Sequence, residues 1–306
     1  MIDRRSALLQ LATGALAALG ASCRGASRSS ASTGNPTMTT SETRSSSSSS
    51  PLSRMPVVFL AHGAPPLLDD KGWLAELAAW AKAMPKPKAL LVLSAHWEAK
   101  PPTIGATETV PLVYDFYGFP ERYYALKYPA PGAPQLAARV RELLRASSLG
   151  VADEPGRGLD HGAWVPLTAM YPAADVPTLQ LSLPSLDAKE LFALGRALAP
   201  LRDEGVMVMG SGFLTHNMRA LGLHTTPDWA KDFDGWVTDV LARRDHDALL
   251  DWKAKAPGAQ LAHPRSEHFA PVVAAAAAAD AGAVTFPITG YWEMAPAFTR
   301  RSVQFG

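Results

Sequence analysis

Five of the eight histidines in this 306-residue chain stand in short motifs whose residue types suit metal binding or proton transfer. They are His62 in LAHGAPP, His96 in VLSAHW, His161 in GLDHGAW, His216 in GSGFLTHN and His268 in PRSEHFAP. Imidazole is the commonest protein ligand of catalytic divalent metals, and it also exchanges protons near neutral pH. The motifs therefore predict a metal or catalytic centre.

Three of these histidines, His62, His96 and His216, are expected at one edge of a sheet. Each follows a short, continuous apolar run, and these runs are residues 56–60, 89–93 and 206–209. Such runs indicate strands that are buried on both faces of a parallel sheet. Sheets of this kind place their sites at the carboxyl ends of the strands. In the Gly-Ser-Gly of residues 210–212, the small residues would let backbone approach a bound group closely.

The acidic neighbours of the other two histidines leave alternatives open. Glu267 is either a rival metal ligand or a carboxylate that favours the start of a helix. Asp160 either orients the imidazole of His161 or caps the turn. The remaining three histidines have polar or proline-flanked neighbours and are predicted to lie on the surface; they are His224, His246 and His263.

The arrangement of the elements predicts an α/β layered fold. Two further apolar runs, residues 178–183 and 284–288, are strand candidates. Helical spacing of apolar residues predicts helices at 71–84, 134–146, 188–201, 228–241 and 271–279. Alternation of strands and helices is typical of a largely parallel sheet covered by helices. Residues 105–128 are rich in aromatics, glycine and proline, and are expected to form a loop over the site.

The first 54 residues are predicted to stand outside the folded domain. Arg4 and Arg5 precede a short apolar run and then small residues up to Cys23, which indicates a signal peptide over residues 1–23. The arginine pair suggests the twin-arginine route, with an ordinary Sec signal as the alternative. Residues 24–54 are rich in serine and threonine and predict a disordered tether. The protein is thus expected to be exported, either free in the periplasm or tethered to a membrane through a lipidated Cys23.

Composition narrows the chemistry of the remaining domain, residues 55–306. The net charge is +1 without a basic stripe, so no nucleic-acid partner is expected. The apolar run near the start is too short for a transmembrane span. Because Cys23 is the single cysteine, the domain has neither a disulfide nor a thiolate ligand. Imidazole ligands suit Zn, Fe, Cu or Ni, and composition does not distinguish between these metals. Composition also does not predict the oligomeric state.

The motifs, taken in order, resemble those of a known family. HGAPP, SAHW, GLDHGAWVPL, THN and EHF, with YDFYGFPERYY, YPAPG and a closing VQFG, are similar to motifs of the DODA-type extradiol ring-opening dioxygenases. These enzymes are the 4,5-DOPA dioxygenase relatives within class III. The resemblance spans about residues 55–306 and implies a single-domain α/β/α sandwich. It also implies a mononuclear Fe(II) site in which Zn(II) is often found instead, with a catechol and O2 as substrates.

Carried over to this chain, the resemblance implies a role for each histidine. His62, His96 and His268 match the metal ligands. His216 matches an acid/base histidine close to the metal, which is sometimes counted as a fourth ligand. His161 matches a histidine of the substrate pocket, where it would assist His216. Aromatic side chains between Tyr114 and Tyr124 would either line the ring of the substrate or serve ordinary packing.

Two other functions use the same residues. A Zn-dependent hydrolase on a similar scaffold would activate water with these histidines. An exported, non-catalytic protein that binds metal or catechols would fit the signal and the tether, although simple sequestration does not need the proton-transfer pair His216 and His161. Metal identity and oxygen uptake separate these readings.

Overall fold

The computed structural model describes residues 54–279 and 282–306. The signal peptide predicted for residues 1–23, and the predicted tether apart from its last residue, lie outside the described residues and stay predictions. Within the described part, no helix combines the length and the apolar character needed to cross a membrane.

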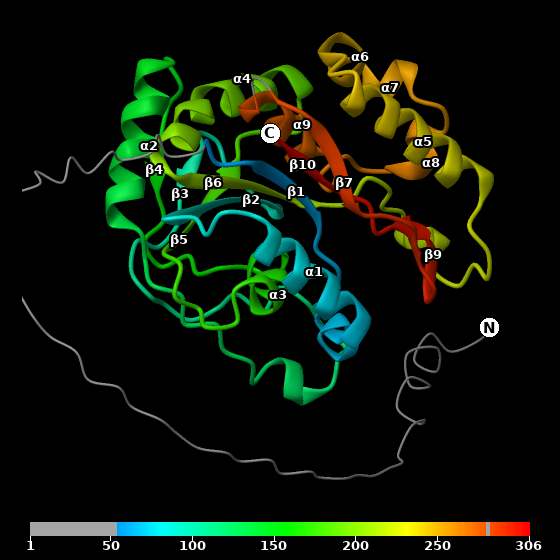
Figure 1. Cartoon of the computed structure of the whole chain (residues 1–306), viewed down its shortest axis with the longest axis horizontal. Helices are drawn as coiled ribbons and strands as arrows, with labels where there is room; N and C mark the ends of the chain where they lie inside the picture. The colour runs from blue at the N-terminus through cyan, green and yellow to red at the C-terminus, as the bar shows by residue number, and fades with distance from the viewer. Residues whose placement is uncertain (1–53, 280–281) are drawn as a thin grey trace, which may run out of the picture. The chain divides into compact units, whose positions relative to one another are not determined.

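A mixed eight-stranded sheet forms the middle layer of the fold (Figure 1). Its order is β4-β3-β5-β2-β6-β1-β10-β7. The strands are β1 (Val57–Ala61), β2 (Ala89–Glu98), β3 (Thr103–Ile104), β4 (Ala152–Asp153), β5 (Thr178–Leu183), β6 (Val206–Gly212), β7 (Val284–Ile288) and β10 (Ser302–Phe305). The four central strands β5, β2, β6 and β1 run parallel, whereas β3 is antiparallel to β5 and β10 is antiparallel to both β1 and β7. The predicted α/β class with a largely parallel sheet is confirmed.

Burial on both faces explains why the central strands are continuously apolar. Alternate side chains of a strand point to opposite faces of its sheet. In β1, Val57 and Phe59 enter one hydrophobic core, while Val58 and Leu60 enter the other. All four are fully buried, and each such side chain stabilises the fold by about 1.5–3 kcal/mol.

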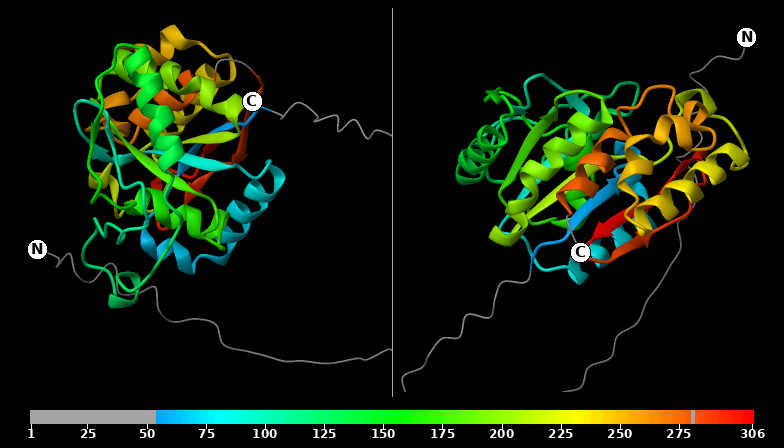
Figure 2. Two further views of the ribbon diagram at one scale, coloured as in Figure 1. Left: turned by 90° about the vertical axis from the view of Figure 1, so that its left-hand side faces the viewer. Right: turned by 90° about the horizontal axis from the view of Figure 1, so that it is seen from above.

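Helices cover both faces of the sheet (Figure 2). On one face lie α1 (Lys71–Ala83) and α3 (His161–Met170), and on the other lie α2 (Pro134–Ala146), α4 (Ala188–Leu198) and α9 (Ala270–Ala278). Next to this second layer are α5 (Asp228–Ala242), α6 (His246–Leu250), α7 (Trp252–Lys255) and α8 (Ala259–Ala262). A separate two-stranded sheet pairs β8 (Tyr291–Trp292) with β9 (Ala295–Thr299).

The alanine-rich helix α9 packs closely against α4 and β6 because glycines of these elements face it. A Cβ atom on Gly195 of α4 would overlap the carbonyl oxygen of Ala274, and one on Gly210 of β6 would lie 2.6 Å from that of Pro271. Absence of these side chains lets α9 lie directly against α4 and β6. Since His268 stands two residues before α9, this packing brings it to the end of β6.

The structure differs from the predicted elements in four places. Strand β2 continues to Glu98, so His96 lies within its last residues rather than after it. Strand β6 continues to Gly212, three residues beyond its predicted end. Helix α4 stops at Leu198, and residues 199–204 form a 3-10 helix with Pro200 in its first turn. Helix α3 was not predicted, because nearly all its residues are buried and Pro166 interrupts its pattern. Residues 105–128 form the expected irregular segment, apart from a 3-10 turn at Glu121–Tyr123.

Candidate metal centre and active site

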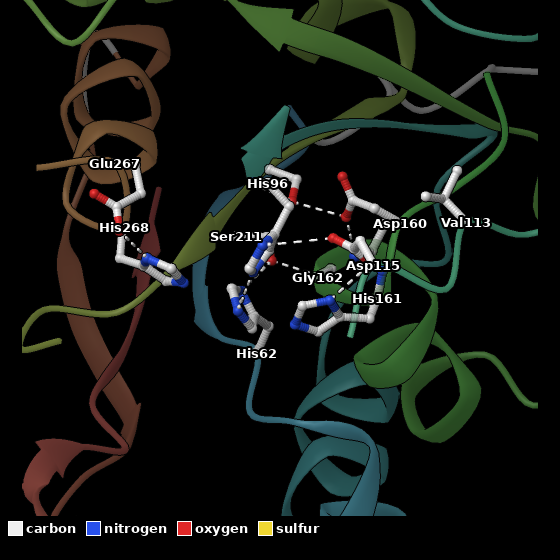
Figure 3. A network of polar contacts seen from close by, with 12 residues as sticks. His62, His96, Val113, Asp115, Asp160, His161, Gly162, Ser211, Glu267 and His268 are labelled. Carbon is white, nitrogen blue, oxygen red and sulfur yellow. Dashed lines mark hydrogen bonds and ion pairs between the residues drawn. The ribbon is translucent and has the colours of Figure 1, made fainter. Parts of the chain in front are cut away.

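The fold brings all five predicted histidines together (Figure 3 shows four of them). His62 directly follows β1, His96 lies near the end of β2, and His216 comes four residues after β6. His161 is the first residue of α3, and His268 closely precedes α9. The imidazole centroid of His62 lies 4.9 Å from that of His96 and 5.4 Å from those of both His161 and His268. The sheet edge thus carries one continuous imidazole cluster.

Potential ligand atoms within this cluster form two groups. One group is His62, His96 and His161, and the other is His216, Glu267 and His268; within each, the ligand atoms lie within 4.8 Å of one another. The predicted ligand set of His62, His96 and His268 takes members from both groups. His268 reaches across, with its ring centroid 4.9 Å from that of His96.

The proton on His62 has a defined position because of Ser211. The Ser211 hydroxyl donates its hydrogen to the carbonyl oxygen of Gly162. Its oxygen must therefore accept from His62 Nδ1, which lies 2.9 Å away. His62 then carries its proton on Nδ1 and keeps a bare lone pair on Nε2, the form that a metal requires.

Asp115 likewise fixes the proton of His161 on Nδ1. Its Oδ1 atom accepts from the Nδ1 of His161 at 2.8 Å and from the backbone N–H of the same residue at 3.1 Å. Its Oδ2 atom faces Nδ1 of His96 at 3.5 Å. Burial alone would raise the pKa of Asp115. The contacts with His161 and His96 outweigh burial, so the pKa of Asp115 is lowered.

Glu267 stands between the Nδ1 atoms of the second group. Its Oε1 atom accepts from Nδ1 of His268 at 3.0 Å and lies 3.9 Å from Nδ1 of His216. The imidazoles of His216 and His268 are stacked, with centroids 3.5 Å apart and planes 10° from parallel. Glu267 is thus a hydrogen-bond partner of His268 and lies two residues before Phe269, the N-cap of α9, while its carboxylate also stands in a group that could hold a metal.

The two facing nitrogens of His62 and His96 provide a test of whether the site fits a metal. Their Nε2 atoms lie 3.1 Å apart, and both Nδ1 atoms face oxygen acceptors. Two bare lone pairs at that distance repel one another unless a shared proton or a metal ion lies between them. A metal–imidazole distance of about 2.1 Å allows a single cation to touch both nitrogens. The donor set therefore fits a divalent metal.

Burial keeps four histidines of the cluster neutral, namely His62, His96, His216 and His268. It lowers the pKa of His96 to about 3 and that of His216 to about 4, and the charges of neighbouring histidines act in the same direction. Burial likewise lowers the pKa values of His62 and His268 well below the usual range. Neutral imidazole is the form that binds a metal, so this environment favours metal binding at neutral pH.

Asp160 caps a helix rather than orienting His161. Its Oδ1 atom accepts from the backbone N–H of Ala163 at 3.2 Å and from the hydroxyl of Ser94 at 2.8 Å. The side chain of Gln180 donates to its other oxygen. Complete burial raises the pKa of Asp160 despite these bonds. The carboxylate that contacts His161 is instead Asp115, which stands 46 residues earlier in the chain.

The aromatic segment that was expected over the site contributes one ring beside it. The ring centroid of Phe116 lies 5.9 Å from that of His161 and 4.8 Å from that of Tyr124. Tyr114 packs against Trp164 of α3. Tyr117 points away, with 92% of its surface exposed. The segment thus packs through Tyr114 and borders the cluster through Phe116, and contact of Phe116 with a substrate ring stays a prediction.

The prediction that His263 lies on the surface is wrong. Its side chain is 5% exposed, its ring packs against Phe233, Trp252 and Phe269, and its Nε2 atom donates to the carbonyl of Leu214 at 2.8 Å. Polar and proline neighbours in the sequence gave no sign of this tertiary packing. The other two histidines of that group are more accessible: His224 is exposed and His246 is half-buried.

Comparison with known proteins assigns this histidine cluster to a family. Residues 52–298 match the model of the catalytic LigB subunit of aromatic ring-opening dioxygenases. The chain belongs to this dioxygenase family. A 4,5-DOPA dioxygenase extradiol of Beta vulgaris is 42% identical over 77% of this chain and 91% of its own length. The protein of the same name from Escherichia coli K12 is 38% identical over 83% and 95%.

A solved structure agrees with this assignment. The crystal structure of an uncharacterized protein from Escherichia coli K12 has a TM-score of 0.71 at 35% identity, and it covers 83% of this chain and all of that one. The protein is therefore an extradiol ring-cleaving dioxygenase, as the motifs predicted. Its family is metal-dependent, and the histidine cluster can hold the metal.

Sequence reasoning missed two residues of the site. Ser211 was noted only as part of a small-residue turn, although its hydroxyl fixes the proton of His62. Asp115 was noted only within the aromatic motif YDFYGFPERYY. A single acidic residue in an otherwise aromatic segment was the available signal, but its partner is distant in the sequence.

Proposed function

We propose that His62, His96 and His268 hold ferrous iron and that the enzyme opens a catechol ring with O2. The observation that carries this proposal is the state of these imidazoles: each Nδ1 faces an oxygen, from Ser211, Asp115 or Glu267, which leaves Nε2 free. When bound, the metal supplies a path for electron density from catecholate to O2 and holds the two reactants together. Zinc is the alternative occupant, since imidazole suits both metals.

The substrate class follows from the relatives. Several relatives are named 4,5-DOPA dioxygenase extradiol, and we propose a DOPA-like catechol for this chain. Phe116 stands beside His161 and offers an aromatic surface for the substrate ring. Aromatic pairs at such distances contribute about 0.5–1.5 kcal/mol beyond the area that they bury.

The proton transfers are assigned to His216 and His161. A catechol hydroxyl must lose its proton on binding, and a later acid must return one to the oxygen derived from O2. His216 is neutral because its pKa is lowered to about 4, so it can accept the first proton. His161 offers a bare Nε2 because its Nδ1 donates to Asp115, and it assists from the substrate side.

Oxygen uptake provides the decisive test. The metal-free protein would be reconstituted anaerobically with Fe(II) or Zn(II), and then mixed with aerated buffer and a panel of catechols that includes DOPA. We expect a yellow product and equivalent oxygen consumption with Fe(II) alone. Tight metal binding without oxygen uptake on any catechol would contradict the iron and substrate assignments.

We also propose that the protein is exported and reaches its final location through residues 1–54. The arginine pair, the short apolar run and Cys23 motivate this proposal, and Cys23 is the candidate for lipid attachment. Fractionation of cells that express the full chain, beside a variant with Lys at positions 4 and 5, tests the route. Incorporation of labelled palmitate that disappears in Cys23→Ser would support a lipid anchor, and a mature chain beginning after residue 23 without label would contradict it.

A further inference from the structure

A single carboxylate contacts both an imidazole proposed to bind metal and one proposed to transfer protons. Asp115 accepts two hydrogen bonds from His161 through Oδ1 and faces Nδ1 of His96 at 3.5 Å through Oδ2. The centroids of the two imidazoles are only 4.0 Å apart. Figure 3 shows Asp115 next to both His96 and His161, at the start of α3.

We propose that Asp115 is a positioning residue that sets the location of the proton on both imidazoles at once. An acceptor at each Nδ1 keeps the proton there, so each Nε2 presents a bare lone pair toward the centre of the cluster. The roles of His96 as ligand and His161 in proton transfer rest on the proposed function. The placement of the two protons rests on the contacts alone.

Only a carboxylate satisfies both contacts. Oδ1 accepts from two donors of His161, the backbone N–H and Nδ1, so an oxygen is needed at that position. An asparagine would keep its single oxygen there and turn its amide nitrogen toward His96. That nitrogen donates and cannot accept, so His96 would have to move its proton from Nδ1 to Nε2. An imidazole with its proton on Nε2 has no lone pair there for a metal.

The same residue links the aromatic segment to the centre. The backbone N–H of Val113 donates to the carbonyl of Leu159 at 2.9 Å, which fixes the segment two residues before Asp115. Phe116 directly follows Asp115 and borders His161. The position of this segment therefore determines both where the protons lie on His96 and His161 and where Phe116 stands beside the cluster.

Histidine nitrogen NMR of the Zn(II)-loaded full chain tests the proposal without any turnover. In the wild type, labelled imidazole nitrogens of His96 and His161 should both show the form protonated on Nδ1. In Asp115→Asn, we expect His161 to keep that form and His96 to change to the form protonated on Nε2. Metal affinity, measured by competition with a chelator for Zn(II), should fall about ten- to hundredfold.

The matched control is Glu190→Gln, which removes an exposed carboxylate on α4 that pairs with Lys100. Because this pair lies outside the histidine cluster, neither the nitrogen spectrum nor metal affinity should change. A wild-type spectrum with His96 protonated on Nε2 would overturn the proposal, even if the Asn variant failed to fold. A proton shift in Asp115→Asn without loss of metal affinity would support the positioning role and contradict His96 as a ligand.

Discussion

At the scale of single residues, the partner of each Nδ1 atom determines what an imidazole can do. A histidine binds metal through the nitrogen that carries no proton, and the acceptor on its other nitrogen selects which one that is. Two carboxylates here each face two imidazoles. Asp115 faces His96 and His161, and Glu267 faces His268 and His216. Each carboxylate thus joins a proposed ligand to a proposed proton-transfer residue.

Replacing Ser211 by Ala should weaken metal binding although Ser211 is not a ligand. Its loss leaves Nδ1 of His62 without its acceptor, so the proton is free to move to Nε2 and compete with the metal. We expect metal affinity to fall about tenfold or more, measured by chelator competition. The control is Ser182→Ala, which removes another buried hydroxyl with backbone partners but lies away from the cluster. Equal metal affinity in both variants would remove the role assigned to Ser211.

Replacing His216 by Ala should separate proton transfer from metal binding. The variant keeps His62, His96 and His268, so we expect near-normal metal content together with a fall in kcat of about a hundredfold or more. Metal analysis beside oxygen-uptake kinetics checks both quantities. Purified His216→Ala protein that contains no metal would instead show that His216 is a ligand.

The limits of sequence reasoning at this scale reflect distance along the chain. The five clustered histidines could be predicted because each stands in a local motif beside a strand or a helix start. Asp115 could not be placed, because its contact with His161 depends on how an irregular segment folds over α3. His263 was misjudged for the same reason, since its burial comes from rings on α5, α7 and the start of α9.

At the scale of elements, close packing of the end of β6 against the segment before α9 brings His268 to the centre. The carbonyl of His268 accepts from the backbone N–H of Phe213 at 2.9 Å. Gly212 faces the same carbonyl, and its missing side chain makes room for it. The small residues at 210–212 were expected to let backbone approach a bound group closely. They are instead the last residues of β6, and the backbone that lies against Gly212 is that of His268.

Replacing Gly212 by Ala should therefore displace His268. The added Cβ would overlap the His268 carbonyl oxygen, and such overpacking costs about 1–3 kcal/mol of stability. We expect a lower midpoint of urea unfolding together with weaker metal binding. Gly235→Ala in α5 is the matched control, because nothing lies within 4 Å of its Cβ position, and alanine is favoured in helices. An unchanged metal affinity in Gly212→Ala would show that His268 does not depend on this contact.

The elements themselves could be predicted in proportion to their periodicity. Amphipathic helices such as α2 and the fully apolar central strands have patterns that can be recognised from the local sequence alone. Helix α3 carries none, since almost every side chain is buried and a proline stands inside it. Strand β10 is only four residues long and antiparallel, and its pairing with β1 depends on the ends of the domain meeting.

At the scale of the whole molecule, buried neutral histidines tie folding to pH. Burial lowers the pKa of six histidines in the described part of the chain: the buried or nearly buried His62, His96, His216, His263 and His268, and the half-buried His246. In the unfolded chain these groups take up protons as the pH falls through about 6.5. The folded protein binds fewer protons than the unfolded chain between about pH 6.5 and 3, so its stability is complete above pH 6.5 and decreases as the pH falls through this range.

His263 allows this linkage to be measured apart from the metal cluster. Burial lowers its pKa to about 3, although its hydrogen bond to the Leu214 carbonyl opposes this. Gln in its place keeps a donor near the Nε2 position and does not titrate. We expect His263→Gln to lose some stability at pH 7.5, but its free energy of unfolding should fall with acidification by about 1.4 kcal/mol per pH unit less than that of the wild type.

Urea unfolding of the metal-free protein at several pH values between 7.5 and 5 gives the two slopes. The carboxyls of buried Asp160 and partly buried Glu267, whose pKa values are raised, act in the opposite direction but contribute equally to both proteins. Their contribution therefore cancels in the difference between the slopes. Identical slopes for His263→Gln and the wild type would mean that His263 is protonated in the folded protein, contrary to its buried setting.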